Sequence, residues 1–296
     1  MKALLLCTSV LALLDGCGSV VAAGPDAGPQ EGPPPAARCD PQKPFAPPAP
    51  VANVNTGDDE IGFTLTRDEL TAFVDHYDTA LPGSNLLAAR RSTATSAFAT
   101  PSASVTGRIN DGNGDEFSPF PSADGLTLFF ARSVAGSPIR VVAAARPDAD
   151  TAFSADLAVT VDGMDVIGDQ PVVSSDGQTL YWVDSLTQQL QAATRGELDT
   201  VFVAQRGISV MPVTNPALSA DELTLYYSNG AGADVLVSTR PTTAASFRDG
   251  VPVPLINTAS RDAPVFLTSD GCVLYMKSDR PGGAGGIDLW EAHRPQ

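Results

Sequence analysis

Residues 174–182 read Ser-Ser-Asp-Gly-Gln-Thr-Leu-Tyr-Trp, a tight turn followed at once by an apolar strand. A turn of this kind, with an apolar strand behind it, occurs five times in the chain. Its aspartates, which lie 45 to 56 residues apart, are Asp68, Asp124, Asp176, Asp221 and Asp270. Self-similarity with a period of this length predicts a repeat architecture in which each repeat is one structural unit.

A second landmark stands at a fixed place in the repeats. An arginine precedes a phenylalanine by seven residues four times, in the pairs Arg91 and Phe98, Arg146 and Phe153, Arg195 and Phe202, and Arg240 and Phe247. Short β-branched and aromatic runs flank both landmarks, so each repeat is expected to hold four short strands. Four strands per repeat are typical of a propeller blade. The sequence therefore predicts an all-β fold, a five-bladed β-propeller of four-stranded blades.

The fifth repeat lacks its last strand. It contains Asp270 and Arg294, but no phenylalanine follows. Upstream, Phe45 precedes the first turn aspartate by 23 residues, which is also the separation between Phe247 and Asp270. We therefore predict that residues 45–57 supply the outer strand of the last blade, so that the N-terminal strand closes the ring and leaves no open sheet edge.

The repeats resemble the TolB-type, WD40-like propeller repeat of bacterial envelope proteins. The match is closest at residues 278–283, Ser-Asp-Arg-Pro-Gly-Gly, and at the Asp-Leu-Trp of residues 288–290, while the Ser-x-Asp-Gly turns carry the rest. Two turns depart from the pattern, because Glu69 and Glu222 stand where the turn glycine belongs. The resemblance covers residues 45–296 and implies a propeller there, a fold that hosts many functions.

The N-terminal segment indicates export. Lys2 precedes a mainly apolar stretch too short to span a bilayer, so residues 1–16 are interpreted as a signal peptide. The sequence Leu-Asp-Gly-Cys at residues 14–17 resembles the bacterial lipobox, which implies lipid attachment at Cys17 and a place in the cell envelope, at the outer membrane since Gly18 follows. An ordinary secretory signal is the alternative. Residues 17–44 are rich in proline, alanine and glycine, which predicts a tether.

Charge and cysteine content exclude several classes of function. With 34 acidic and 18 basic residues the formal charge is -16, which argues against nucleic acid as a partner. Two histidines and four cysteines are too few for a multi-histidine metal centre. Cys7 leaves with the signal peptide, so Cys39 and Cys272 remain in an oxidising compartment and are predicted to form a disulfide at the ring closure. Two unpaired thiols are the alternative.

A second acidic series precedes the first strand of four blades. It consists of Glu60, Glu116, Asp169 and Asp262. First strands line the channel of a propeller, so these side chains are expected to gather at one mouth, where like charges raise pKa values or recruit a cation. They form a candidate rim for a basic ligand or a metal ion. In the alternative interpretation they hydrogen-bond to loops of the neighbouring blade.

One loop resembles the first half of a calcium site. Asp111, Asn113 and Asp115 place oxygen side chains at alternate positions, but the glycine and the bidentate glutamate of such loops are missing. A glycine-asparagine turn is the alternative, and no other cofactor is expected. His76 is placed in a surface loop after the second strand of the first blade.

These features favour a membrane-anchored envelope lipoprotein whose propeller is a non-enzymatic binding platform for a protein or a cell-wall polymer. The alternative is a glycoside hydrolase, which would use the carboxylates of the second acidic series as acid and base. A carbohydrate-binding propeller that stacks sugars on Trp182, Tyr227 and Trp290 is a third hypothesis. Their strand positions point instead to core packing for these rings.

Overall fold

The computed structural model describes residues 38–78, 83–112, 114–196, 201–229 and 234–296. These residues belong to one compact unit that begins at Ala37, so residues 38–44 are part of the folded body rather than of the tether. The predicted signal peptide, Cys17 and the tether up to residue 37 lie outside the described residues. Within the described ranges, no helix is long and apolar enough to cross a membrane.

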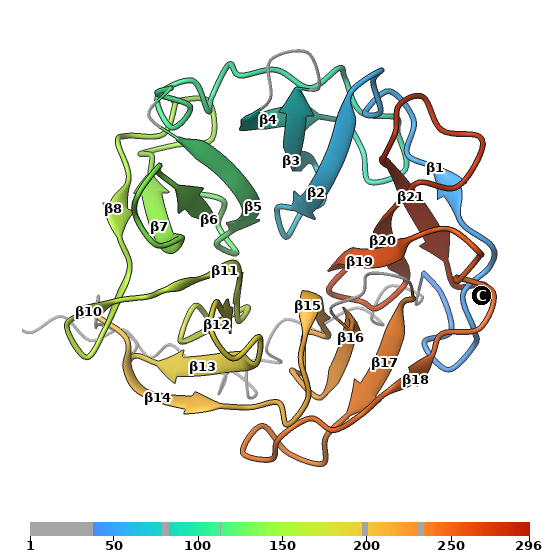
Figure 1. The fold of residues 1–296 in the computed structure, drawn as a ribbon. Helices are drawn as coiled ribbons and strands as arrows, with labels where there is room; N and C mark the ends of the chain where they lie inside the picture. The colour runs from blue at the N-terminus through green and yellow to red at the C-terminus, as the bar shows by residue number, and fades with distance from the viewer. Residues whose placement is uncertain (1–37, 79–82, 113, 197–200, 230–233) are drawn as a thin grey trace, which may run out of the picture. The chain divides into compact units, whose positions relative to one another are not determined.

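The compact unit is a ring of five antiparallel sheets, which confirms the predicted five-bladed propeller (Figure 1). In every blade the first strand lies nearest the centre of the ring. These inner strands are β2 (Asp59–Leu65), β5 (Asp115–Pro121), β11 (Gly168–Val173), β15 (Thr214–Leu218) and β19 (Asp262–Leu267). Next come β3 (Thr71–Asp78), β6 (Thr127–Ser133), β12 (Thr179–Asp184), β16 (Thr224–Ser228) and β20 (Val273–Ser278).

The third and outer strands complete the blades. The third strands are β4 (Gly83–Arg90), β7 (Arg140–Ala145), β13 (Leu190–Thr194), β17 (Leu236–Thr239) and β21 (Asp288–His293). The outer strands are β8 (Leu157–Ala158), β14 (Val203–Gly207), β18 (Val251–Pro252) and β1 (Ala49–Pro50). In the first blade the outer position is held by a single bridge between Ala88 and Ser102. A small hairpin of β9 (Thr160–Val161) and β10 (Met164–Asp165) follows the second blade.

The repeated aspartates are hydrogen-bond acceptors in the turns between first and second strands. In the third blade, Asp176 Oδ1 accepts the hydroxyl of Ser174 at 2.6 Å and the N–H of Gln178 at 2.9 Å. The next residue, Gly177, has a φ of 73°, a left-handed conformation that glycine adopts without strain. Glu69 and Glu222 hold the same conformation at 59° and 61°, which costs each of them roughly 1 kcal/mol.

In each blade the repeated arginine acts as a clamp on the turn between the first and second strands. Arg146 Nε donates to the carbonyl of Gly125 at 2.9 Å, and its guanidinium carbon lies 4.5 Å from the centre of the Phe153 ring. The same Nε bond and ring contact recur in all five blades. Arg294 also donates to the hydroxyl of Tyr226 in the preceding blade, at 2.8 Å. The arginine-phenylalanine spacing therefore encodes a cation-π contact that holds the blade together.

The last blade takes its ring and its outer strand from the other end of the chain. Arg294 lies 4.0 Å from the centre of the Phe45 ring, in place of the phenylalanine that the fifth repeat lacks. Strand β1 pairs with β21, Ala49 opposite Glu291 and Pro50 opposite Trp290. This confirms that the N-terminal strand closes the ring, although only two residues of the predicted range form a ladder.

Removal of the Phe45 ring tests the closure. The side chain is 1% exposed and packs edge-on against Tyr226 at 5.9 Å. We expect Phe45→Ala to lower the free energy of unfolding by about 3–5 kcal/mol, because it opens a cavity and removes the cation-π contact at the seam. Chemical denaturation measures this loss. The control Val251→Ala, at a side chain 64% exposed on β18, should change stability by less than about 0.5 kcal/mol.

Candidate functional site

The second acidic series does not form an exposed rim. Glu60, Glu116 and Asp262 are each 0% exposed, so the interpretation of these three as an open binding site is wrong. The oxygens of Glu60 and Asp262 hold the loops that lead into their strands. Glu60 accepts the N–H and the hydroxyl of Thr56 at 3.0 and 2.6 Å, and Asp262 accepts the same two groups of Thr258. Unsatisfied backbone donors in a loop explain why acids recur there.

Glu116 and the predicted calcium loop share one arginine. Glu116 lies 3.2 Å from Arg132, and burial raises its pKa to about 7. Arg132 also pairs with Asp111 at 3.3 Å, whereas Asp115 accepts the backbone N–H of Ser84 at 3.1 Å. The two carboxylates of the loop therefore serve different protein partners, and Asn113 lies outside the described residues. Among the residues that the structure places, no group of three or more acids, histidines or cysteines is arranged to hold a metal ion.

Asp169 is the member of the series that remains half-buried. Burial raises its pKa to about 6, and Gln170 donates to it at 3.3 Å. Burial lowers the pKa of Lys277, which interacts with Asp169 and with Asp75. Sequence reasoning missed Asp75 and Lys277. Each stands seven residues after a turn aspartate, so a comparison of second strands across the repeats would have singled them out.

Asp75 and Lys277 join neighbouring blades. Asp75 accepts the N–H of Ser118 from the second blade at 3.1 Å, and burial raises its pKa to about 7. The Lys277 ammonium donates to the carbonyl of Ile61 in the first blade at 3.0 Å. Both charges therefore stabilise blade contacts.

His76 belongs to strand β3 and its side chain is 18% exposed, so its placement in a surface loop is wrong. Its ring lies 3.4 Å from Glu60.

The inner strands of neighbouring blades contact one another around the centre of the ring. Each inner strand departs from regular register, and in three of them the irregular residue precedes a proline at a φ of 53°: Ser118, Gln170 and Asn215. The Asn215 N–H donates to the side-chain oxygen of Gln170 at 2.5 Å. A pocket of about 40 Å³ lies between these residues, which is about the room that one or two water molecules occupy.

A larger cavity opens where the inner strands end at the turns. Its volume is about 400 Å³, and all five blades contribute to its wall. Its apolar lining is Phe120, Val172, Leu218, Val265 and Phe266. We call this opening the turn-side mouth.

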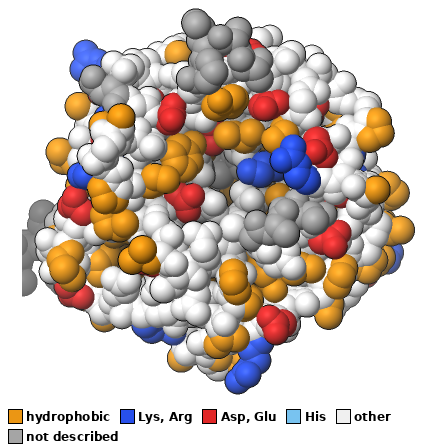
Figure 2. All heavy atoms as spheres, in the orientation of Figure 1, with side chains coloured by type: hydrophobic (Ala, Val, Ile, Leu, Met, Phe, Trp, Pro, Cys, Tyr) orange, Lys and Arg blue, Asp and Glu red, His pale blue; other side chains and the backbone are white. Residues whose placement is uncertain are grey.

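Trp182, Tyr227 and Trp290 are at most 5% exposed and belong to the core, as their strand positions predicted. Figure 2 shows one face of the molecule, with a central hollow beside which acidic and basic side chains lie close to apolar ones.

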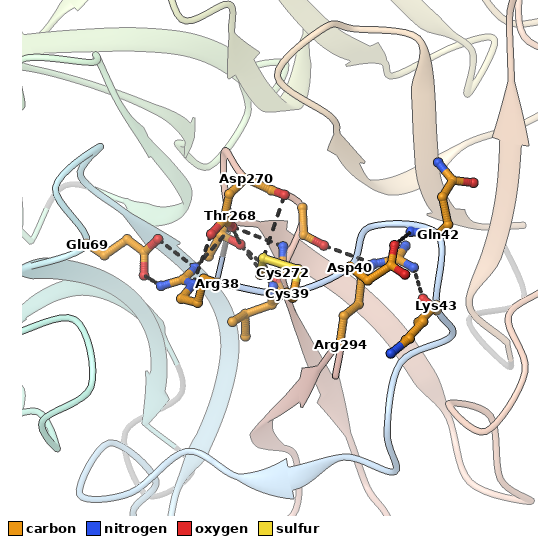
Figure 3. The surroundings of a disulfide bond; sticks show 12 residues. Arg38, Cys39, Asp40, Gln42, Lys43, Glu69, Thr268, Asp270, Cys272 and Arg294 are labelled. Atoms are coloured by element: carbon orange, nitrogen blue, oxygen red, sulfur yellow. Dashed lines mark hydrogen bonds and ion pairs between the residues drawn. A yellow bond between two sulfur atoms is a disulfide. The ribbon is translucent and has the colours of Figure 1, made fainter. Parts of the chain in front are cut away.

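The N-terminal residues of the body lie at the rim of the turn-side mouth. A disulfide joins Cys39 to Cys272, with 5.6 Å between their Cα atoms, which brings together the two cysteines for which a bridge was predicted. Next to it, Arg38 lies between Glu69 and Asp270 at 2.8 and 2.9 Å (Figure 3). Both of these acids also line the mouth.

Comparisons with known proteins show the fold alone. No family model and no curated protein matches the chain. A GH43_1 enzyme from Xanthomonas citri complexed with xylose is 14% identical over 84% of this chain and 90% of that chain, with a TM-score of 0.62. The RS223 β-xylosidase is 12% identical over 83% and 94%, with a TM-score of 0.60. TolB from Acinetobacter baumannii is 13% identical over 81% and 55%, with a TM-score of 0.47.

The buried carboxylate of Glu116 predicts a pH dependence of stability. Because its pKa is raised from 4.5 to about 7 in the folded state, the folded protein binds the proton more tightly between these values. Its contribution is therefore fully favourable below pH 4.5 and is lost as the pH rises to about 7. We expect Glu116→Gln to be more stable than the parent at pH 8 by about 1–3 kcal/mol, and the difference to vanish near pH 4. Denaturation at both pH values measures it; equal differences would contradict the assignment.

The disulfide predicts a loss of stability on reduction. It closes a loop across 233 residues, so Cys39→Ala is expected to cost about 3–5 kcal/mol through the freedom that the unfolded chain regains. Thermal unfolding with and without reductant measures this. The double variant with Cys272→Ala should lose no more than the single one, and reductant should leave both unchanged.

Proposed function

We propose that this protein is a non-enzymatic binding platform of the bacterial cell envelope that holds a partner protein at the turn-side mouth. One observation carries the proposal. The mouth is an open cavity of about 400 Å³ whose apolar lining comes from the ends of all five inner strands. Val265, Phe266 and Leu218 are only half-buried there, so a ligand that covered them would gain the hydrophobic contribution that they lack in the free protein.

The scaffold around the mouth suits a binding site. Phe120, Val172, Leu218, Val265 and Phe266 stand on inner strands, and the turn at the end of such a strand is held by its aspartate, its arginine and a phenylalanine ring. A site built on such strands changes little when the ligand arrives, which lowers the entropic cost of binding.

The envelope location is part of the proposal. The Cys39–Cys272 disulfide is typical of proteins that fold in an oxidising compartment. The lipobox-like residues 14–17 support a lipid anchor at Cys17 and therefore attachment to a membrane surface.

A glycoside hydrolase is the second candidate, because solved structures of similar fold include a GH43_1 enzyme and a β-xylosidase. Three of the carboxylates that this hypothesis invoked are buried and bonded to loops or to an arginine. Of the four, Asp169 is left, and it interacts with Lys277. We expect no hydrolysis of xylotriose or aryl xylosides by the mature protein. Turnover that Asp169→Asn abolishes would replace the platform proposal with this one.

Site-specific photo-crosslinking tests the platform. Benzoylphenylalanine is introduced at Ser175, an exposed residue at the mouth, or at Leu186, which is 91% exposed and does not line the mouth. In native cells we expect a discrete adduct from position 175 and none from position 186. The adduct should disappear when Leu218→Lys places a charge in the cavity. Adducts of equal yield from both positions, or none from either, would contradict a partner site at the mouth.

A further inference from the structure

We infer that the turn-side mouth receives the C-terminal end of the partner protein, with the apolar last residues in the cavity and the terminal carboxylate on Arg67. The inference rests on the proposed function and names the part of the partner that is bound. Two features of the mouth carry it, an apolar wall and one guanidinium group whose hydrogen-bond donors are unused.

The entrance to the mouth is a ring of five equivalent residues. Each stands immediately before the turn aspartate of its blade, and all five are exposed and line the cavity: Arg67, Ala123, Ser175, Ala220 and Ser269. Four of them are alanine or serine, whose short side chains leave the opening free. The first blade therefore brings one long cationic side chain to a ring that is otherwise small.

Arg67 differs from the other arginines at the turns in its hydrogen bonds. The five clamp arginines donate to turn carbonyls and lie over phenylalanine rings, and Arg38 lies between Glu69 and Asp270. Among the residues that the structure describes, none accepts a hydrogen bond from Arg67 or forms an ion pair with it. A guanidinium has five N–H donors in a planar fork, which binds a carboxylate through two parallel hydrogen bonds.

The acids that line the mouth are already bonded within the protein. Glu69 accepts two hydrogen bonds from Arg38, at 2.8 and 2.9 Å, and Glu222 accepts the hydroxyl of Tyr181. Asp270 pairs with the same arginine, Arg38, at 2.9 Å. Acids and arginines at the five turns are equal in number. Selectivity for a ligand therefore comes from the unused donors of one arginine rather than from a net charge of the mouth.

The apolar wall selects the side chains of the ligand. Phe120 and Phe266 stand 6.3 Å apart, ring centre to ring centre, and both are half-buried at the cavity, as are Leu218 and Val265. Polar groups placed against these side chains would lose water without gaining hydrogen bonds, which costs free energy. Leucine or aromatic side chains are therefore the occupants that the wall favours.

The shape of the mouth favours a chain end over an internal segment. All five blades contribute to its wall, so the cavity is enclosed around the axis of the ring. An internal segment would have to enter and leave through one opening and turn within about 400 Å³, whereas a chain end enters as a single strand. A C-terminal end also places a carboxylate directly beside its last side chain, and capture of that carboxylate is a recurring mode of peptide recognition.

Four hexapeptides with an N-terminal label test the chemistry. The probe is Gly-Ser-Gly-Ala-Leu-Phe with a free C-terminal carboxylate, and its first control is the same peptide as the C-terminal amide. The second control, Gly-Ser-Gly-Ala-Gly-Ser with a free carboxylate, lacks the apolar side chains. The third, Gly-Leu-Glu-Phe-Gly-Ser as its amide, carries the carboxylate inside the chain. By fluorescence anisotropy on the mature chain with Cys17→Ser, we expect the probe to bind at least about fivefold more tightly than any control.

Variants at the entrance locate the carboxylate. Arg67→Gln should reduce binding of the probe to the level of its amide and leave binding of the amide unchanged. Arg248→Gln, at an exposed arginine that does not line the mouth, is the matched control and should change neither. Ser175→Arg added to Arg67→Gln returns a guanidinium to the ring from the third blade. This double variant should again bind the probe more tightly than the amide, by about twofold or more.

Variants at the wall locate the apolar side chains. Leu218→Asp, at the cavity wall, should reduce binding of the probe about tenfold or more, because it places a charge against the apolar residues of the ligand. Leu255→Asp, at a side chain that is 61% exposed and does not line the mouth, should leave it unchanged.

The outcomes separate this inference from the proposed function. Equal affinity for the probe and its amide would overturn the inference, and so would binding of the probe that Arg67→Gln leaves intact. Binding of the peptide with the internal glutamate, or of octanoate, as tightly as the probe would also overturn it, because the mouth would then accept any apolar carboxylate. If no peptide binds but the crosslink from position 175 forms, the inference fails and the platform stands. If neither is seen, both proposals fail.

Discussion

The structure depends on the contact between a guanidinium group and a phenylalanine ring in each blade. The arginine Nε donates a hydrogen bond to a carbonyl in the turn of its own blade. The guanidinium of the same arginine lies over the phenylalanine ring and so ties the ring to that turn. Five equal blades close into a ring only if the fifth has the same clamp. The chain supplies it with Phe45 from its N-terminal side, and the disulfide beside Arg38 holds that segment to the turn of the last blade.

Closure has a consequence for the charged residues of the interior. Neighbouring blades leave backbone N–H and C=O groups facing each other near the axis, and these groups need partners in a place with little water. Asp75 and Lys277 provide them between blades, whereas Glu60 and Asp262 bond the loops that lead into their own strands. Carboxylates that would be catalytic candidates in another propeller are thus parts of the scaffold. The open surface that remains at the centre is the apolar cavity at the turns, which the proposed function assigns to a partner.

Much of the fold was predictable because it is periodic. Each repeat carries the turn aspartate and the arginine in register, so a single strand assignment holds for every blade, and the missing phenylalanine of the fifth repeat points to Phe45. Burial depth was not predictable in this way. Glu60 and Asp169 hold similar places in the repeat, yet one is fully buried and the other is half-buried.

The sequence by itself determined the number of blades, their strand order and the seam between the two ends of the chain. These features follow from hydrogen bonds and ring contacts that recur at fixed spacings in the repeats, and Phe45 supplies the one ring that the fifth repeat lacks. Only the tertiary structure decided which acids are open to solvent and where a cavity remains. Those properties arise where five blades meet, and their physical cause is the packing of inner strands from distant parts of the chain around one axis.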